Sequence, residues 1–381
     1  MKNNNIEDDT PSILTAVAAV LPSNYNFEVV KTIQKIRNFG SKLVGLQLPE
    51  GLLLFSCALA DLIRHFTGAQ CTVLGDVTYG ACCIDDLGAA ALGCDFLVHY
   101  GHSCLVPIDA TNGGAFSNGK SLRVLYVFVD IAFDTSHLIE TVRDKFSSNS
   151  RLAIMSTIQF APALYELKEA LDNDSNSDSI SRIIVPQAKP LSPGEVLGCT
   201  SPKLDECAID ALIFVSDGRF HLESAMIHNP HIPAFRYDPY SKVMTREHYD
   251  TTSMMSIRHT AVKIASSAKR FGVILGTLGR QGSTVLLERL EAKLQVAGKE
   301  YFTVLLSEIS PAKLALFDKN EVEAWVQIAC PRLSIDWSQG FGDIPLLTPY
   351  ECEVAIGTTQ WRDTYPMDFW AKKGTSSWQA R

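Results

Sequence analysis

The residues with the most distinctive chemistry in this sequence are its ten cysteines. Two of them, Cys82 and Cys83, are adjacent in the segment DVTYGACCIDD. Adjacent thiols could form a disulfide, bind a metal, or pack in a core as small apolar side chains. The chain has no C-x-x-C and no C-x-x-x-C-x-x-C, so the local signatures of a zinc ribbon, a thioredoxin-like site and an ordinary radical-SAM loop are missing. Any metal site must therefore draw its cysteines from distant parts of the chain.

Composition limits the class of protein. The chain has 381 residues, 46% of them hydrophobic and 20% charged, which is enough apolar material for two or three globular cores. The net charge of −8 argues against a protein that binds bare nucleic acid or an anionic membrane through charge. We therefore expect neither nucleic acid nor membrane among its partners.

The start of the chain indicates a cytoplasmic location. The segment MKNNNIEDDT is polar and acidic, unlike a secretory signal, and the apolar run at 13–21 is too short to span a bilayer. Thr10 and Pro11 predict the start of a docked amphipathic helix there instead. In a reducing compartment the cysteines are thiols or metal ligands rather than a disulfide framework.

Short apolar runs with helical patterns between them predict the elements that position these thiols. Because runs that are apolar on both sides are typical of buried parallel strands, we expect an α/β protein with mainly parallel sheets. The segregation of leucines and charges over 284–296 predicts one of its helices. The predicted strands are 42–48, 71–76, 95–100 and 123–129, then 151–157, 182–186, 211–216 and 232–237, then 271–276, 301–306, 324–329 and 344–348.

The third strand of each set begins with an acid, and these acids are evenly spaced. Asp95 and Asp210 are 115 residues apart, and Glu323 follows after a further 113. This interval indicates three tandem homologous α/β domains. We place them at residues 1–133, 134–250 and 251–381.

Three cysteines differ from the others in their positions relative to these acids. Cys82 and Cys199 follow the second predicted strand of their domains, 13 and 11 residues before the acid, and Cys330 ends a third strand. These loops lie at the carboxyl ends of strands, where open α/β sheets bind ligands. If three domains turn those edges toward one axis, the three thiolates converge. Four other cysteines have apolar neighbours in helical or strand contexts, which predicts buried and inert thiols: Cys57, Cys71, Cys94 and Cys207.

Three thiolates fit an iron-sulfur cluster better than structural zinc. Structural zinc takes four protein ligands, whereas a cluster held at three corners keeps one iron open for a substrate. The competing interpretation, that each of these cysteines is a core residue, applies to any one of them taken alone.

Several longer strings give the chain a family resemblance. LQLPEGLL, GDVTYGACCIDD, LVHYGHSCLVPID, GEVLGCTSP, FVSDGRFHLESAMI, LGTLGRQG and ACPRLSIDW resemble the subunit 1 family of 2-(3-amino-3-carboxypropyl)histidine synthase, which acts in diphthamide biosynthesis. The resemblance implies three homologous domains around a pseudo-threefold axis. It also implies a 4Fe-4S cluster held by Cys82, Cys199 and Cys330, with Cys83 only a neighbour.

The same resemblance implies an activity and partners. The 3-amino-3-carboxypropyl group of S-adenosylmethionine (SAM) is transferred to C2 of one histidine imidazole in elongation factor 2, the first step of diphthamide biosynthesis. Because an imidazole carbon is a poor nucleophile, a radical route started by electron transfer from the cluster is expected. A paralogous subunit 2 in a heterodimer and a small iron-binding electron donor complete the implied assembly.

Six residues are candidates for contacts to SAM. Gly279, Arg280 and Gln281 lie in a glycine-rich turn between a predicted strand and helix, whose backbone N–H groups could bind a carboxylate or ribose, although a tight turn without a ligand is an equal alternative. Arg332 and Asp336 could meet the two charged ends of an amino acid, or form a plain ion pair. His102 is the sixth candidate, and we expect its side chain on the face opposite to that of His99. The alternative is that His102 only forms hydrogen bonds with carbonyls at the end of the strand.

Two other functions remain open. The chain could be a noncatalytic scaffold subunit of the same heterodimer, although its three cysteines favour the catalytic role. It could also be a nucleotide-binding oxidoreductase with Rossmann-like domains. The glycine loop reads G-x-x-G-x-x-G rather than G-x-G-x-x-G, which counts against this third function.

Overall fold

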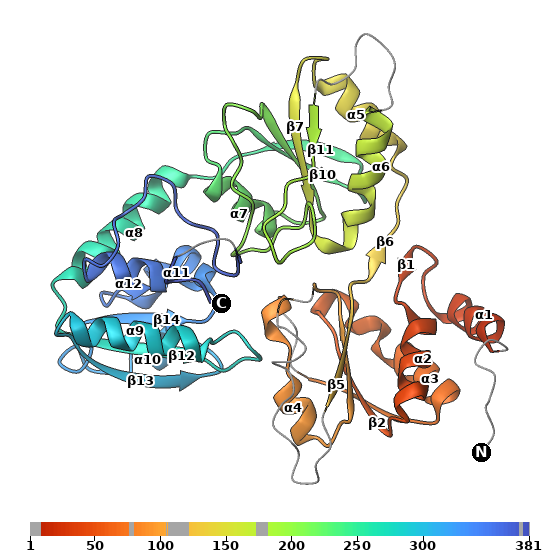
Figure 1. Cartoon of the computed structure of the whole chain (residues 1–381), viewed down its shortest axis with the longest axis horizontal. Helices are drawn as coiled ribbons and strands as arrows, with labels where there is room; N and C mark the ends of the chain where they lie inside the picture. The colour runs from red at the N-terminus through yellow and green to blue at the C-terminus, as the bar shows by residue number, and fades with distance from the viewer. Residues whose placement is uncertain are drawn as a thin grey trace. The chain divides into compact units, whose positions relative to one another are not determined.

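The computed structural model describes residues 9–75, 80–103, 105, 122–172, 182–372 and 376–380. The chain divides into two compact units (Figure 1). The first unit comprises residues 1–135 and 158–165, and the second comprises 136–157 and 166–381. Tyr79 and Cys104, which belong to the strings behind the family resemblance, lie outside the described residues.

The first unit contains a parallel sheet with the order β3-β2-β4-β5, and a two-stranded antiparallel pair, β1 with β6. The elements of this unit are α1 (Thr10–Val20), β1 (Tyr25–Asn26), α2 (Val29–Phe39), β2 (Leu43–Gln47), η1 (Glu50–Phe55), α3 (Ser56–Thr67), β3 (Gln70–Val73), η2 (Ala81–Cys83), α4 (Asp86–Ala91), β4 (Phe96–Tyr100), β5 (Arg123–Val127), β6 (Asp130–Ile131) and η4 (Ile158–Phe160). Helix α6 (Ala161–Asp172) begins among its residues and continues into those of the second unit.

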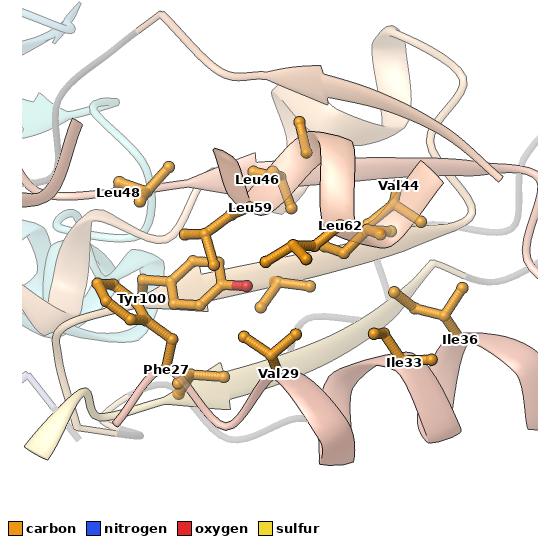
Figure 2. Packing of buried hydrophobic residues seen from close by; sticks show 14 of the residues in the cluster. Phe27, Val29, Ile33, Ile36, Val44, Leu46, Leu48, Leu59, Leu62 and Tyr100 are labelled. Atoms are coloured by element: carbon orange, nitrogen blue, oxygen red, sulfur yellow. The ribbon is translucent and has the colours of Figure 1, made fainter. Parts of the chain in front are cut away.

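The core of the first unit lies between its sheet and the helices α2 and α3. Figure 2 shows Ile33 and Ile36 of α2 facing Val44 and Leu46 of β2, with Tyr100 at one end of the cluster. Helices α2 and α3 each end at a glycine with positive φ, which halts the helix and turns the chain into the next strand. The sheet is thereby covered by amphipathic helices whose lengths the glycines fix.

The second unit contains two further sheets. One has the order β11-β10-β9-β7-β8 and is parallel except for β11, and the other is parallel with the order β13-β12-β14-β15. The elements are α5 (Ser136–Lys145), β7 (Arg151–Ser156), β8 (Arg182–Ile184), β9 (Ala211–Val215), α7 (Phe220–His228), β10 (Ala234–Asp238), β11 (Val243–Glu247), α8 (Thr251–Ser266), β12 (Arg270–Gly276), α9 (Thr284–Val296), β13 (Glu300–Leu306), α10 (Pro311–Leu314), β14 (Ala324–Ile328), α11 (Pro331–Trp337), η5 (Ser338–Phe341), β15 (Leu346–Leu347) and α12 (Pro349–Ala355).

These sheets confirm the predicted fold class. Each predicted apolar run overlaps a strand, and α9 has the predicted bounds. In all three larger sheets the first strand along the chain lies between the second and the third, and the fourth follows the third. The chain is therefore an α/β protein with mainly parallel sheets in tandem, while the three domain boundaries stay predictions.

The three regularly spaced acids make the same contact in each sheet. The Asp95 carboxylate accepts the backbone N–H of Lys42, at 2.8 Å, just before the first strand of its sheet. Asp210 accepts the N–H of Arg151 at 2.8 Å, and Glu323 accepts that of Lys269 at 2.5 Å. Each acid thus satisfies a donor at the start of the first strand, which explains why an acid recurs at the start of each third strand.

A shared cluster of side chains joins the two sheets of the second unit. Residues from α7, α8, α11, α12 and the C-terminal segment pack in it: Ile227, Met254, Ile335, Tyr350, Tyr365, Met367 and Trp378. Among the helices that the structure describes, none has the length and apolar character needed to cross a bilayer.

Candidate metal centre

The Cys82 turn belongs to the first unit. Cys82 is half-buried in η2, beyond the carboxyl end of β3, as predicted. Gln47, the last residue of β2, holds this turn by its side-chain amide: its Nε2 donates to the Cys83 carbonyl at 2.8 Å, and its Oε1 accepts the N–H of Asp85 at 3.1 Å. Asp85 in turn caps α4. The backbone on both sides of Ile84, directly after the cysteine pair, is therefore fixed to the sheet.

His99 supports Gln47 from the neighbouring strand. Its Nδ1 lies 2.9 Å from Gln47 Oε1, and because an amide oxygen only accepts, Nδ1 carries the proton. Burial, with a smaller contribution from His102, lowers the pKa of His99 to about 3. His99 is therefore a neutral donor at physiological pH.

The prediction that His99 and His102 point to opposite faces is wrong. Their ring centroids are 5.9 Å apart. Alternation holds only within a strand, and β4 ends at Tyr100, after which Gly101 turns the chain with φ of 84°. His102 is half-buried beside His99, and its contact with SAM stays a prediction.

Cys199 and Cys330 belong to the second unit, where Arg332, two residues beyond Cys330, donates to the carbonyl of Gly198, the residue before Cys199. Cys330 is half-buried, two residues beyond the end of β14, and Cys199 is buried in a turn between β8 and β9. Their positions beyond strand ends are as predicted. Burial raises the pKa of Cys199 to about 12, with the neighbouring Cys330 thiol as the second cause, while Arg332 opposes the shift. A metal must therefore displace a proton from Cys199 when it binds.

Gln327 holds the Cys330 turn much as Gln47 holds the Cys82 turn. Its Nε2 donates to the Cys330 carbonyl at 2.9 Å and to Ser334 Oγ at 3.1 Å, and its Oε1 accepts the N–H of Ala329 at 2.9 Å. Sequence reasoning missed both glutamines. The signal was present, because each is a polar residue near the carboxyl end of an otherwise apolar strand.

The Cys199 turn is held by the C-terminal segment, which sequence reasoning also missed. The N–H of Ser201 donates to the Met367 carbonyl at 2.9 Å, and the N–H of Trp370 donates to Thr200 Oγ1 at 3.0 Å. Cys199 lines a cavity of about 20 Å³ together with Pro331 and Trp378. This volume holds about one water molecule, so the cavity does not accommodate SAM.

Arg332 is buried and forms an ion pair with Asp336, whose side chain is 24% exposed. The Nε of Arg332 donates to the Asp336 carboxylate at 2.8 Å, and its Nη2 donates to Glu223 at 2.5 Å. Burial raises the pKa of Asp336, although Arg332 counteracts it. The alternative of a plain ion pair therefore describes their contacts, and binding of the two ends of an amino acid stays a prediction.

The glycine-rich turn lies next to the Cys330 turn. A Cβ placed on Gly276 would lie 2.6 Å from that of Ala329, and Gly279 has φ of 54°. Ser283 caps α9 by accepting the N–H of Leu286 at 3.3 Å. Close approach and a left-handed conformation thus account for these glycines, and contacts of Gly279, Arg280 and Gln281 with SAM stay a prediction.

The other cysteines differ in part from expectation. Cys94 is buried and Cys71 is half-buried, and burial raises the pKa of each to about 11. Cys57 and Cys207 are exposed, so the prediction that they are buried is wrong. Cys57 lies on the solvent side of α3, and Cys207 lies in a turn before β9, where apolar neighbours in sequence do not imply burial.

No ready-made metal site is visible within the described part of the chain, where no three His, Cys, Asp or Glu side chains gather around one point. The ligand set of Cys82, Cys199 and Cys330 stays a prediction, with one thiol in the first unit and two in the second.

Comparisons with known proteins define the class. The family model for diphthamide synthesis proteins matches residues 48–366. The chain is 54% identical to 2-(3-amino-3-carboxypropyl)histidine synthase subunit 1 of Gallus gallus over 99% of its length and 86% of the relative's. It is 53% identical to the protein of that name in Homo sapiens, over 96% of the chain and 80% of the relative. The chain therefore belongs to the diphthamide synthesis family.

A solved structure shares the fold and names a cofactor. Dph2 from Pyrococcus horikoshii with a 4Fe-4S cluster matches with a TM-score of 0.69 and 25% identity, over 90% of this chain and 93% of that one. The structure of the same protein described without the cluster matches with the same TM-score and 24% identity, covering 89% and 93% of the two chains.

Proposed function

We propose that this chain is the cluster-bearing subunit of an enzyme that transfers the 3-amino-3-carboxypropyl group of SAM to C2 of a histidine imidazole in elongation factor 2. It works in a heterodimer with a paralogous subunit 2 and receives electrons from a small iron-binding protein. Membership of the diphthamide synthesis family supports the pathway, and the cluster named for the Pyrococcus relative supports the cofactor.

The single observation that carries the proposal is that the Cys199 and Cys330 turns are joined: Arg332, two residues beyond Cys330, donates to the carbonyl of Gly198, the residue before Cys199, at 3.3 Å. These thiols come from turns 131 residues apart in sequence, at the carboxyl ends of two sheets, and their donor chemistry suits iron. With Cys82 they would hold a 4Fe-4S cluster at three corners, leaving one iron for SAM. When bound, the cluster supplies the electron that cleaves the sulfonium bond of SAM.

The protein's own residues position and shield the reactants in this proposal. Gln47 and Gln327 fix the backbone of two ligand turns, and burial of Cys199 keeps one thiolate away from water. The turn at Gly279, Arg280 and Gln281, next to the Cys330 turn, is the proposed contact for the polar end of SAM. Asp336 and His102 are proposed to contact other parts of SAM.

The test uses the heterodimer purified without oxygen. Wild-type protein should be brown and should contain about four iron atoms per chain, the content of one 4Fe-4S cluster. With dithionite, SAM and elongation factor 2, the target histidine should gain the mass of one 3-amino-3-carboxypropyl group. C82A, C199A and C330A should each lose iron and activity.

C57A is the matched control, because it also replaces a cysteine by alanine but at an exposed position on α3. It should retain iron and activity. Iron retained in C199A or C330A would contradict the ligand assignment. Full activity of heterodimers that carry C330A would favour the alternative, a noncatalytic scaffold subunit.

A further inference from the structure

The guanidinium of Arg332 connects the two cysteine turns of the second unit. Arg332 is two residues beyond Cys330, in the first turn of α11, and its side chain is 4% exposed. Its Nη1 donates to the carbonyl of Gly198, the residue before Cys199, at 3.3 Å, and to the carbonyl of Phe220 at 2.8 Å. One side chain therefore joins the backbone of both turns.

Two carboxylates fix the orientation of this guanidinium. Glu223 of α7 accepts from Nη2 at 2.5 Å, and Asp336 accepts from Nε at 2.8 and 3.0 Å. Because the donors of a guanidinium lie in one rigid plane, these acids and the carbonyls of Gly198 and Phe220 together define its position. A lysine, with one nitrogen, cannot reach all four partners.

The Phe220 ring completes the contact. The guanidinium carbon of Arg332 lies 4.2 Å from the centroid of this ring, a cation–π arrangement. Gly198 packs on the same ring so closely that a Cβ there would lie 2.2 Å from Cε1. The backbone next to Cys199 is therefore positioned by Phe220, which is itself in contact with Arg332.

We propose that Arg332 is a positioning residue that sets the separation of the Cys199 and Cys330 sulfur atoms, and thereby the geometry in which they bind the cluster. This inference rests on the proposed function. In this inference Arg332 holds the two cysteine turns in place and does not bind SAM, since four of its N–H donors already have protein partners. G198A should also change the separation of the two cysteine turns, because the added Cβ displaces either Phe220 or the Cys199 turn.

The experiment compares R332K with R236K. Arg236 is a matched control, because it lies in the same unit and also contacts a backbone carbonyl and two carboxylates, those of Ser216, Asp238 and Glu247, none of which belongs to a cysteine turn. The readouts are iron per chain, the rate at which a chelator removes iron, and the electron paramagnetic resonance spectrum of the reduced protein. R332K should lose iron roughly tenfold or more faster than wild type, with an altered spectrum.

Two further variants keep the test decisive if R332K folds poorly. F220L retains the charge network and removes the ring, and G198A retains Arg332 and disturbs the Cys199 turn. Both should accelerate iron loss and alter the spectrum, whereas a merely structural ion pair predicts lower stability with an unchanged spectrum. If wild type binds the cluster and R332K, F220L and G198A behave like R236K, this inference is wrong. If wild type binds no cluster, the proposed function itself fails.

Discussion

At the scale of single residues, the buried His99 and the half-buried His228 lie beside two of the turns that carry the proposed ligands. His99 donates to Gln47, which holds the Cys82 turn, and His228 lies 2.9 Å from the Ser201 carbonyl, two residues beyond Cys199. Burial lowers the pKa of His99 to about 3 and that of His228 to about 4. Both side chains are therefore neutral in the folded protein well below the pKa of an ordinary histidine.

These depressed pKa values predict that acid destabilises the fold. Between about pH 6.5 and the folded pKa of each histidine, the unfolded chain binds more protons, so stability falls as the pH is lowered. H99Q should remove one such dependence, at most about 1.4 kcal/mol per pH unit. The measurement is the urea-induced unfolding of wild type and H99Q at about pH 7 and about pH 5, followed by circular dichroism. An unchanged pH dependence in H99Q would contradict the prediction.

Sequence reasoning predicted the positions of the three cysteines but not the residues that hold their turns. The spacing of Cys82, Cys199 and Cys330 from the recurring acids places them correctly beyond strand ends. The C-terminal partners of the Cys199 turn are not predictable in this way, because they depend on tertiary contacts. Trp370 meets Thr200 across 170 residues of sequence, a pairing that no local pattern encodes.

At the scale of elements, the strands were predictable because burial on both faces leaves a run of apolar residues. Strand β11 was missed because it is an antiparallel edge strand with a partly polar sequence. Strands β1 and β6 were missed because two residues carry no periodicity. The extent of α9 was predictable because its leucines face the core at helical spacing: Leu286, Leu290 and Leu294 are buried.

Strand β12 contains a glycine whose replacement should be unfavourable. Within a strand, alanine is ordinarily more favourable than glycine. At Gly272, however, a Cβ would lie 2.2 Å from Cζ3 of the buried Trp325. G272A should therefore lower the free energy of unfolding by about 1–3 kcal/mol, the usual effect of overpacking.

Urea titration followed by tryptophan fluorescence measures this effect, and Trp325 itself reports it. G51A is the control, because a Cβ on Gly51 meets no atom within 4 Å. Equal or higher stability of G272A would show that the Trp325 ring can move aside without loss of packing.

At the scale of the whole molecule, the two units have separate cores, and one buried ion pair stabilises only the second. The guanidinium of Arg258 bonds both carboxylate oxygens of Glu351 at 2.6 and 2.7 Å and the carbonyls of Ser334 and Leu346 at 2.7 Å. Neither side chain is exposed to solvent. This pair connects α8, α11, α12 and β15.

R258M should weaken the second unit by about 3–5 kcal/mol, because it leaves the Glu351 carboxylate buried and without its counter-charge. All five tryptophans of the chain belong to that unit, so fluorescence follows it alone, while circular dichroism follows both units. R258M should move the fluorescence transition to lower urea and leave part of the circular dichroism transition in place. R258M/E351M should recover part of the loss. A circular dichroism transition that moved as a whole with fluorescence would contradict independent cores.

The pairing of residues 199–201 with 367–370 sets an order of events in the cell. A ribosome completes the sequence of the Cys199 turn long before it adds Met367 and Trp370, so a nascent chain carries that turn without the segment that is hydrogen-bonded to it. The Cys199 turn therefore takes its final form only after residues 367–370 have been synthesised. On the proposed function, loading of the cluster should follow that step.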